Sequence, residues 1–161
     1  MPFKPSYILP EAIKKLERYC AYRERCHKEA VSKLKEMGMI PEAIDQIMAH
    51  LVLEGYLNEE RFAKSFARGK FTIKKWGRNR ITNELKQRNI SKYNIQTALR
   101  EIDEEDYQRT LDTLARKRVN QLTGKSLPEK RRKLADYLFY RGWENHLVYD
   151  KIEALLKEQH L

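Results

Sequence analysis

Apolar residues recur along the chain in a pattern that is repeated three times. In each copy one amphipathic helix ends on a leucine, the chain turns through Gly or Asn, and a second helix follows with apolar residues at fixed spacings. The matching positions are Leu34, Gly38, Met39, Ile44, Met48 and Leu51, then Leu85, Asn89, Ile90, Ile95, Leu99 and Ile102, and finally Leu138, Gly142, Trp143, Val148, Ile152 and Leu155. The copies begin about 50 residues apart, a period typical of stacked helical repeats that present an extended surface to a large partner.

The same periodicity predicts nine helices and no strand, with three helices in each copy. The first helix is expected at about 10–25 and the second at about 27–37. Asn58, Ser91 and Ser126 are placed to cap helix starts, and Gly or Asn follows most helix ends. We therefore expect an all-α protein, a curved and elongated tandem array of three three-helix, helix-turn-helix-like repeats. The predicted boundaries are 1–57, which includes an N-terminal extension, 58–103 and 104–161.

Positive charge is concentrated in two blocks of the chain. The 161 residues include 33 Lys and Arg against 23 Asp and Glu, a net charge of +10. Residues 64–92 contain a single acidic residue, Glu84, and residues 116–133 contain only Glu129, whereas basic and acidic residues nearly balance over 1–60. Such blocks can simply be solvated helix faces. Because both fall where the first and second helices of a repeat meet, we expect them to form one basic stripe that contacts a polyanion or an acidic protein surface.

The candidate contact residues are the cations of these two blocks. They are Lys74, Lys75, Arg78, Arg80, Lys86, Arg88, Arg116, Lys117, Arg118, Arg131 and Arg132. Two tryptophans are further candidates for this surface. Trp143 occupies a ladder position and is expected in the core, while Trp76 stands among cations and could serve either as core or as a contact residue.

The sequence gives little support for an enzyme or a metal protein. No glycine-rich phosphate loop is present, and Cys26-His27 has no second Cys/His pair at a zinc-like spacing. We read Cys26 as a half-buried thiol beside a surface imidazole. Cys20 and Cys26 are assigned to one predicted helix at a spacing that points them apart, so free thiols and a reducing cytoplasm are expected. We expect no cofactor, no metal and no membrane segment.

Two segments carry a resemblance to a known family. The segment GYLNEERFA, from Gly55 to Ala63, resembles a motif of the RecX family, bacterial regulators of the RecA recombinase. Gly77-Arg78-Asn79-Arg80-Ile81, followed by Glu84-Leu85, is similar to the next motif of that family, although many relatives have Pro where Arg78 stands here. The resemblance extends over about residues 15–156, nearly the whole chain.

The resemblance implies a curved array of three-helix repeats that binds in the groove of the RecA–single-stranded-DNA filament. Such a protein would span neighbouring subunits and modulate ATP hydrolysis, strand exchange and filament stability, mainly as an inhibitor and without covalent chemistry. Direct contact with single- or double-stranded DNA stays open, and a monomer is expected. The alternative is a stand-alone helix-turn-helix DNA-binding protein. A nuclease is disfavoured because the sequence has no clustered acidic or metal-binding set.

Overall fold

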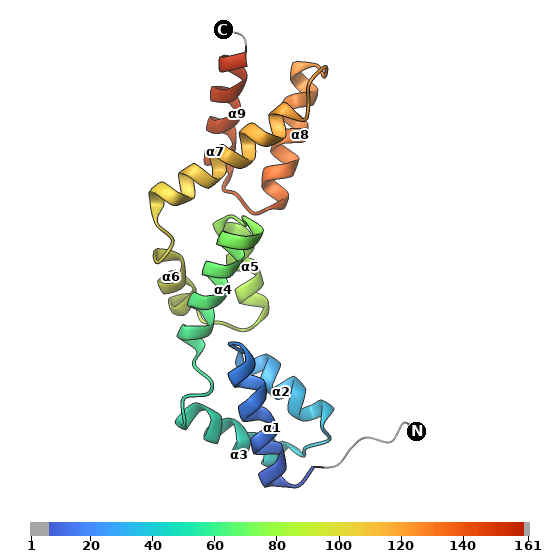
Figure 1. Ribbon diagram of the computed structural model, residues 1–161, viewed down its shortest axis with the longest axis vertical. Coiled ribbons are helices and arrows are strands. Elements are labelled where there is room, and N and C mark those ends of the chain that lie inside the picture. The colour runs from blue at the N-terminus through green and yellow to red at the C-terminus, as the bar shows by residue number, and fades with distance from the viewer. Residues whose placement is uncertain (1–6, 160–161) are drawn as a thin grey trace, which may run out of the picture. The chain divides into compact units, whose positions relative to one another are not determined.

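The computed structural model describes residues 7–159, and every regular element in that range is an α-helix (Figure 1). The helices are α1 (Leu9–Tyr22), α2 (His27–Glu36), α3 (Pro41–Leu53), α4 (Glu59–Lys74), α5 (Arg78–Gln87), α6 (Lys92–Arg100), α7 (Glu104–Asn120), α8 (Leu127–Tyr140) and α9 (Asn145–Gln159). The prediction of an all-α protein with nine helices is therefore confirmed over the described residues.

The chain divides into two compact units. Unit 1 holds the described residues up to 65 together with 85–97, and unit 2 holds 66–84 together with the described residues from 98 onward. The division passes through α4, α5 and α6, the three helices of the second predicted repeat. Compactness thus divides the chain differently from the sequence repeat, and the three repeat boundaries stay a prediction.

Helices α1, α2 and α3 contact one another and form the core of unit 1. Its buried side chains are Ala12, Leu16, Cys20, Ala30, Leu34, Met37, Ile44, Ile47, Leu51 and Leu57. Pro41 begins α3, where the missing N–H of proline costs nothing because the first turn has no intrahelical acceptor for it. The apolar ladder of the first repeat therefore faces this core, as the periodicity predicts.

The end of α1 differs from the prediction. The helix ends at Tyr22 rather than near residue 25, because the backbone of Arg23 is extended, with φ −158° and ψ 163°. Cys20 consequently lies in α1 while Cys26 immediately precedes α2, so the two cysteines do not share a helix. Both thiols are free and buried, and Cys26 is completely buried rather than half-buried. Burial raises the pKa of Cys20 to about 11, so its thiol stays protonated at neutral pH.

Helices α7, α8 and α9 contact one another in unit 2. Trp143 is fully buried there, which confirms its predicted place in the core. The Asp103 side chain caps α7 by accepting from the backbone N of Asp106 at 3.1 Å, and Ser126 accepts from the N of Glu129 at 3.4 Å to cap α8. The Ser126 cap was predicted from the sequence and the Asp103 cap was not, and together they fix where α7 and α8 begin.

Candidate partner-binding surface

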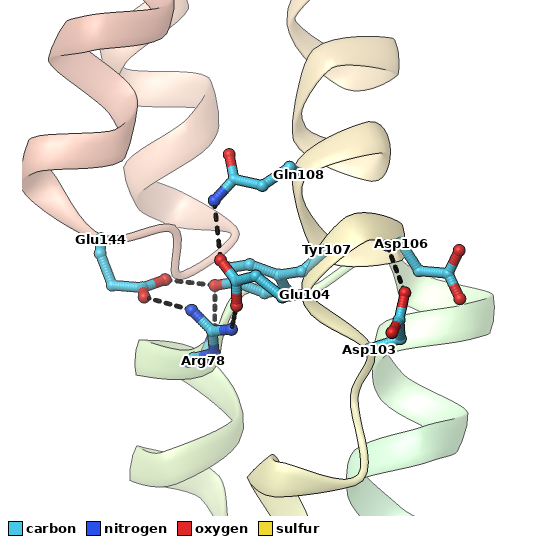
Figure 2. Close-up of polar contacts among 7 residues, drawn as sticks. All are labelled: Arg78, Asp103, Glu104, Asp106, Tyr107, Gln108 and Glu144. Atoms are coloured by element: carbon cyan, nitrogen blue, oxygen red, sulfur yellow. Dashed lines mark hydrogen bonds and ion pairs between the residues drawn. The ribbon is translucent and has the colours of Figure 1, made fainter.

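Arg78, the first residue of α5, lies in a cluster of polar side chains inside unit 2 (Figure 2). Its Nη1 donates to Glu144 Oε2 at 3.0 Å, and its Nη2 donates to Glu104. The guanidinium carbon lies 3.7 Å from the centroid of the Tyr107 ring. The Tyr107 hydroxyl accepts from the backbone N of Arg78 at 2.8 Å and donates to Glu144. The cluster joins the start of α5 to the starts of α7 and α9.

The cluster holds its charges in a fixed protonation state. Burial alone would lower the pKa of Arg78, but hydrogen bonds to Glu144 and Glu104 outweigh it and raise that pKa. Burial, followed by the hydrogen bond to Glu144, raises the pKa of Tyr107 far above its usual range. Hydrogen bonds from Gln108 and then Arg78 lower the pKa of Glu104. Arg78 is therefore charged and compensated within the chain, with 25% of its side chain exposed.

Two glycines meet beside this cluster. The backbone N of Gly77 donates to the carbonyl O of Arg141 at 2.8 Å, and the N of Asn79 donates to that of Gly142 at 2.9 Å. A Cβ on Gly77 would lie 2.5 Å from the carbonyl O of Gly142, and a Cβ on Gly142 would collide with the backbone N of Arg80. Glycine at both positions thus allows the α4–α5 turn to contact the α8–α9 turn backbone to backbone. This gives a physical reason for the Gly in the second motif of the sequence.

Arg116 and Arg131, two further predicted contact residues, form ion pairs with carboxylates of their own unit. Arg116 Nε donates to Asp112 at 2.8 Å and its Nη1 donates to Glu158 at 2.7 Å. Arg131 donates to Glu153 at 2.8 Å through Nε. These pairs are about half exposed, so they add little stability, but they offset part of the positive charge of the second block.

Five of the predicted cations have exposed side chains with no partner among residues 7–159. They are Lys74, Lys75, Lys86, Lys117 and Arg132. Lys86 belongs to unit 1 and the other four to unit 2. Lys75 has a left-handed backbone, with φ 59°, which the sequence does not predict for a lysine. These five side chains are the part of the predicted stripe that is available to an external anion.

The remaining predicted residues have partial contacts. Arg88 is half-buried. Arg118 lies 5.4 Å from the centroid of the Tyr137 ring and donates to Gln121 at 3.2 Å. Arg80 lies between two aromatic rings. Among the predicted cations, Arg78, Arg116 and Arg131 are thus paired with carboxylates, whereas Arg80 and Arg118 have aromatic and polar contacts.

Arg80 lies between the rings of Trp76 and Tyr140 in unit 2. Its guanidinium carbon is 4.2 Å from the Trp76 centroid and 4.8 Å from the Tyr140 centroid, and Nη1 donates to the Tyr140 carbonyl at 3.2 Å. Lys70 Nζ lies 5.0 Å from the Trp76 centroid, and Phe66 meets the Trp76 ring edge-to-face. Trp76 is half-buried, so its ring is partly packed within the fold and partly exposed beside these cations.

Sequence reasoning missed Tyr107, Glu144 and Tyr140. Glu144 lies 66 residues after Arg78, and no local spacing connects the two. Tyr140 is 71% exposed at the end of α8, and the one signal in the sequence is its position next to Arg141, near the Trp143 ladder position. The fold, rather than the charge pattern, places Tyr107 in the core of unit 2 beside Arg78 and leaves Tyr140 exposed beside Arg80.

The described residues offer no metal site and no membrane helix. Between residues 7 and 159, no three His, Cys, Asp or Glu side chains are grouped so that they could hold a metal ion. Within the same range, each helix is too short or too polar to cross a bilayer.

Comparisons with known proteins agree with this fold and with these motifs. Two family models match, the second three-helix domain of RecX over residues 58–99 and the third over 104–152. The chain is 32% identical over 128 residues to "Regulatory protein RecX" of Pseudomonas putida (strain GB-1), covering 80% of each chain. A protein of the same name from Lactobacillus johnsonii is 30% identical over 89 residues, which are 55% of this chain but only 33% of that longer protein.

A crystal structure of RecX from Lactobacillus salivarius has the same fold, with a TM-score of 0.80 and 22% sequence identity, over 91% of this chain and 96% of that one. The matched family models include Gly77, Arg78, Tyr107 and Glu144. The Pseudomonas relative extends the similarity to four fifths of the chain. The chain belongs to the RecX family of regulatory proteins, and its role is regulatory rather than catalytic.

Proposed function

We propose that this chain regulates a RecA recombinase by binding the RecA–single-stranded-DNA filament, and that it lowers ATP hydrolysis and strand exchange by that filament. Membership of the RecX family is the observation that carries the proposal. The GYLNEERFA segment, which begins at the Gly55 turn and enters α4, adds a specific match to it. As a monomer the chain could bind a repeating partner through several of its helices at once.

The partner contact is assigned to the cations that have no partner within the chain. Charges already paired with carboxylates, such as Arg78, Arg116 and Arg131, exert a weaker field at a distance than unpaired ones. Lys74 and Lys75 of the first basic block, and Lys117 and Arg132 of the second, can attract acidic protein surface or DNA phosphate without first breaking an internal ion pair. Arg78 instead positions the turn that presents Lys74 and Lys75.

Neutralising either unpaired set should weaken filament binding. Lys74→Gln/Lys75→Gln and Lys117→Gln/Arg132→Gln are each expected to reduce affinity about tenfold, because two charge contacts of about 0.7 kcal/mol each are lost. Binding is measured on RecA filaments assembled on immobilised single-stranded DNA with a non-hydrolysable ATP analogue. Lys35→Gln/Lys92→Gln removes two exposed cations outside the predicted set and serves as the matched control.

Bare single-stranded DNA on the same support separates the two sources of contact. A loss seen only on filaments supports contact with RecA, and an equal loss on bare DNA supports contact with DNA phosphate inside the complex. Filament affinities that match the wild type for both variants would contradict the assignment of these cations.

A further inference from the structure

Unit 1 has an open cavity of about 700 Å³ on the surface of α1 and α2, far from the predicted contact set in the sequence. Five cationic side chains, three tyrosines and one carboxylate, that of Glu11, line it. The sequence hides this concentration of charge, because residues 1–60 are nearly neutral in total. The fold gathers cations at the cavity and leaves most of the carboxylates of this segment elsewhere.

Two of the lining cations have no partner within the described chain. Lys14 and Arg18 are exposed and form no ion pair or hydrogen bond through their side chains with residues 7–159. Two others have long ion pairs, since Lys33 lies 4.0 Å from Glu36 and Arg25 lies 3.8 Å from Glu29. The fifth, Lys15, donates to the hydroxyl of Tyr7. An anion entering the cavity would therefore meet a net positive field without displacing a strong internal ion pair.

The tyrosines of the cavity differ in how their rings are used. The Arg25 guanidinium, only 8% exposed, stacks 3.7 Å from the Tyr19 centroid. Lys15 Nζ lies 4.8 Å from the Tyr7 centroid and donates to its hydroxyl at 2.7 Å. Tyr22 is 85% exposed, and its ring has no stacking or cationic partner among the described residues. Tyr22 is thus the aromatic surface of the cavity that is open to a ligand.

Helix geometry puts the open ring in line with the unpaired cations. Lys14, Arg18 and Tyr22 follow one another at intervals of four on α1, so they lie on one face in steps of about 6 Å along the axis. A ligand running along this face would meet two cations and then a flat aromatic ring. Cations that follow the phosphate backbone, combined with an aromatic ring on which a base stacks, are the arrangement by which proteins bind single-stranded nucleic acids.

We infer that this cavity binds single-stranded nucleic acid, with phosphates at Lys14 and Arg18 and a base stacked on Tyr22. A duplex fits less well, because its bases are already stacked on one another and are not free to stack on Tyr22. An acidic peptide would satisfy the cations but would leave the exposed ring without a flat partner. The inference does not depend on the proposed function, since the cavity lies outside the cations assigned to the filament.

Photocrosslinking locates the bound strand on the intact protein. An oligo(dT) carrying 5-iododeoxyuridine is irradiated with the full chain, and tryptic peptides are analysed by mass spectrometry. The expected crosslink is to Tyr22, in the peptide from Tyr19 to Arg23. The same strand annealed to its complement should lose this crosslink. Absence of any crosslink within 19–23, or equal crosslinking by the duplex, would overturn the inference.

Two substitutions test the roles of ring and charge by fluorescence anisotropy on labelled oligo(dT). Tyr22→Ala should weaken binding about tenfold, the loss of one stacked base, whereas Tyr93→Ala, which removes another exposed tyrosine of unit 1, should not. Lys14→Gln/Arg18→Gln should reduce the slope of log affinity against log salt by about 1.4 relative to Lys35→Gln/Lys92→Gln.

Competitors identify the class of ligand. Unlabelled oligo(dT) should displace the probe, whereas thymidine monophosphate and poly-glutamate at the same charge concentration should not. Displacement by the mononucleotide would replace the inferred strand site with a nucleotide site. Displacement by poly-glutamate, or equal affinities for the cavity variants and their matched controls, would show that binding follows net charge alone and would contradict the inference.

Discussion

Gly142→Ala is expected to destabilise unit 2 by about 3 kcal/mol or more. Two costs add at this position. The backbone has φ +90°, a left-handed conformation that a Cβ disfavours, and that Cβ would also collide with the backbone N and Cβ of Arg80. Backbone atoms cannot rotate away as a flexible side chain can, so the α4–α5 turn would have to move. The hydrogen bond from Asn79 to Gly142 would be strained by that movement.

Gly124→Ala is the matched control for this prediction. Gly124 has a similar φ of +83° but no atom within 4 Å of its added Cβ, so it carries the conformational cost alone, about 1 kcal/mol. Urea unfolding followed by tryptophan fluorescence measures both variants, and both tryptophans, Trp76 and Trp143, lie in unit 2. Equal destabilisation by the two substitutions would show that the close contact between the two turns adds nothing to the loss in the free energy of unfolding, which would contradict the prediction.

Arg78→Ala should destabilise the same unit by about 2 kcal/mol. The substitution leaves the Glu144 carboxylate, 19% exposed, without its cation, and it removes the cation stacked on Tyr107. A fully buried pair would cost more, but both side chains keep some access to water. The same tryptophan-detected urea unfolding measures the loss in the free energy of unfolding.

Arg109→Ala is the comparison for Arg78→Ala. Arg109 also forms an ion pair in unit 2, with Asp106 at 2.7 Å, but the two side chains are 69% and 55% exposed. Screening by water reduces such a pair to less than about 0.5 kcal/mol. If Arg78→Ala were no more destabilising than Arg109→Ala, the Arg78 cluster would have no structural role, and Arg78 would return to the candidates for direct partner contact.

Local features of the fold were predictable because their physical causes are local in sequence. Asn58 accepts from the backbone N of Arg61 at 2.8 Å, as its position before an acidic first turn predicts. Asn89 has φ 59°, the left-handed turn expected at the end of a predicted helix. Trp143 is buried because it occupies a position of the repeated apolar ladder.

Features that depend on contacts between distant residues were not predictable in this way. The spacing of residues around Arg78 contains no sign that Glu144, 66 positions later, would compensate it. Likewise, the early end of α1 accompanies the stacking of Arg25 on Tyr19, a contact that helical periodicity does not include. The cavity of unit 1 has no counterpart in the net charge along the sequence, because its cations separate from most carboxylates only in the folded helix pair.

The ion pairs formed in the fold divide the cations of each basic block into two groups. A block of like charges in the sequence contains both residues that hold the fold, such as Arg78, and residues without internal partners, such as Lys74 and Lys75. Substitutions in the first group lower stability, and we expect substitutions in the second group to lower affinity with stability unchanged. Measuring both quantities for each variant keeps the two roles apart.

ATP hydrolysis by RecA on single-stranded DNA, titrated with the wild-type chain, tests the central claim most directly. The account predicts that hydrolysis falls at amounts of the chain well below one per RecA subunit, because each bound chain affects neighbouring subunits of the filament. Lys74→Gln/Lys75→Gln should need a higher concentration for the same effect. A rate of hydrolysis that stays unchanged at a saturating concentration of the wild-type chain would contradict the account.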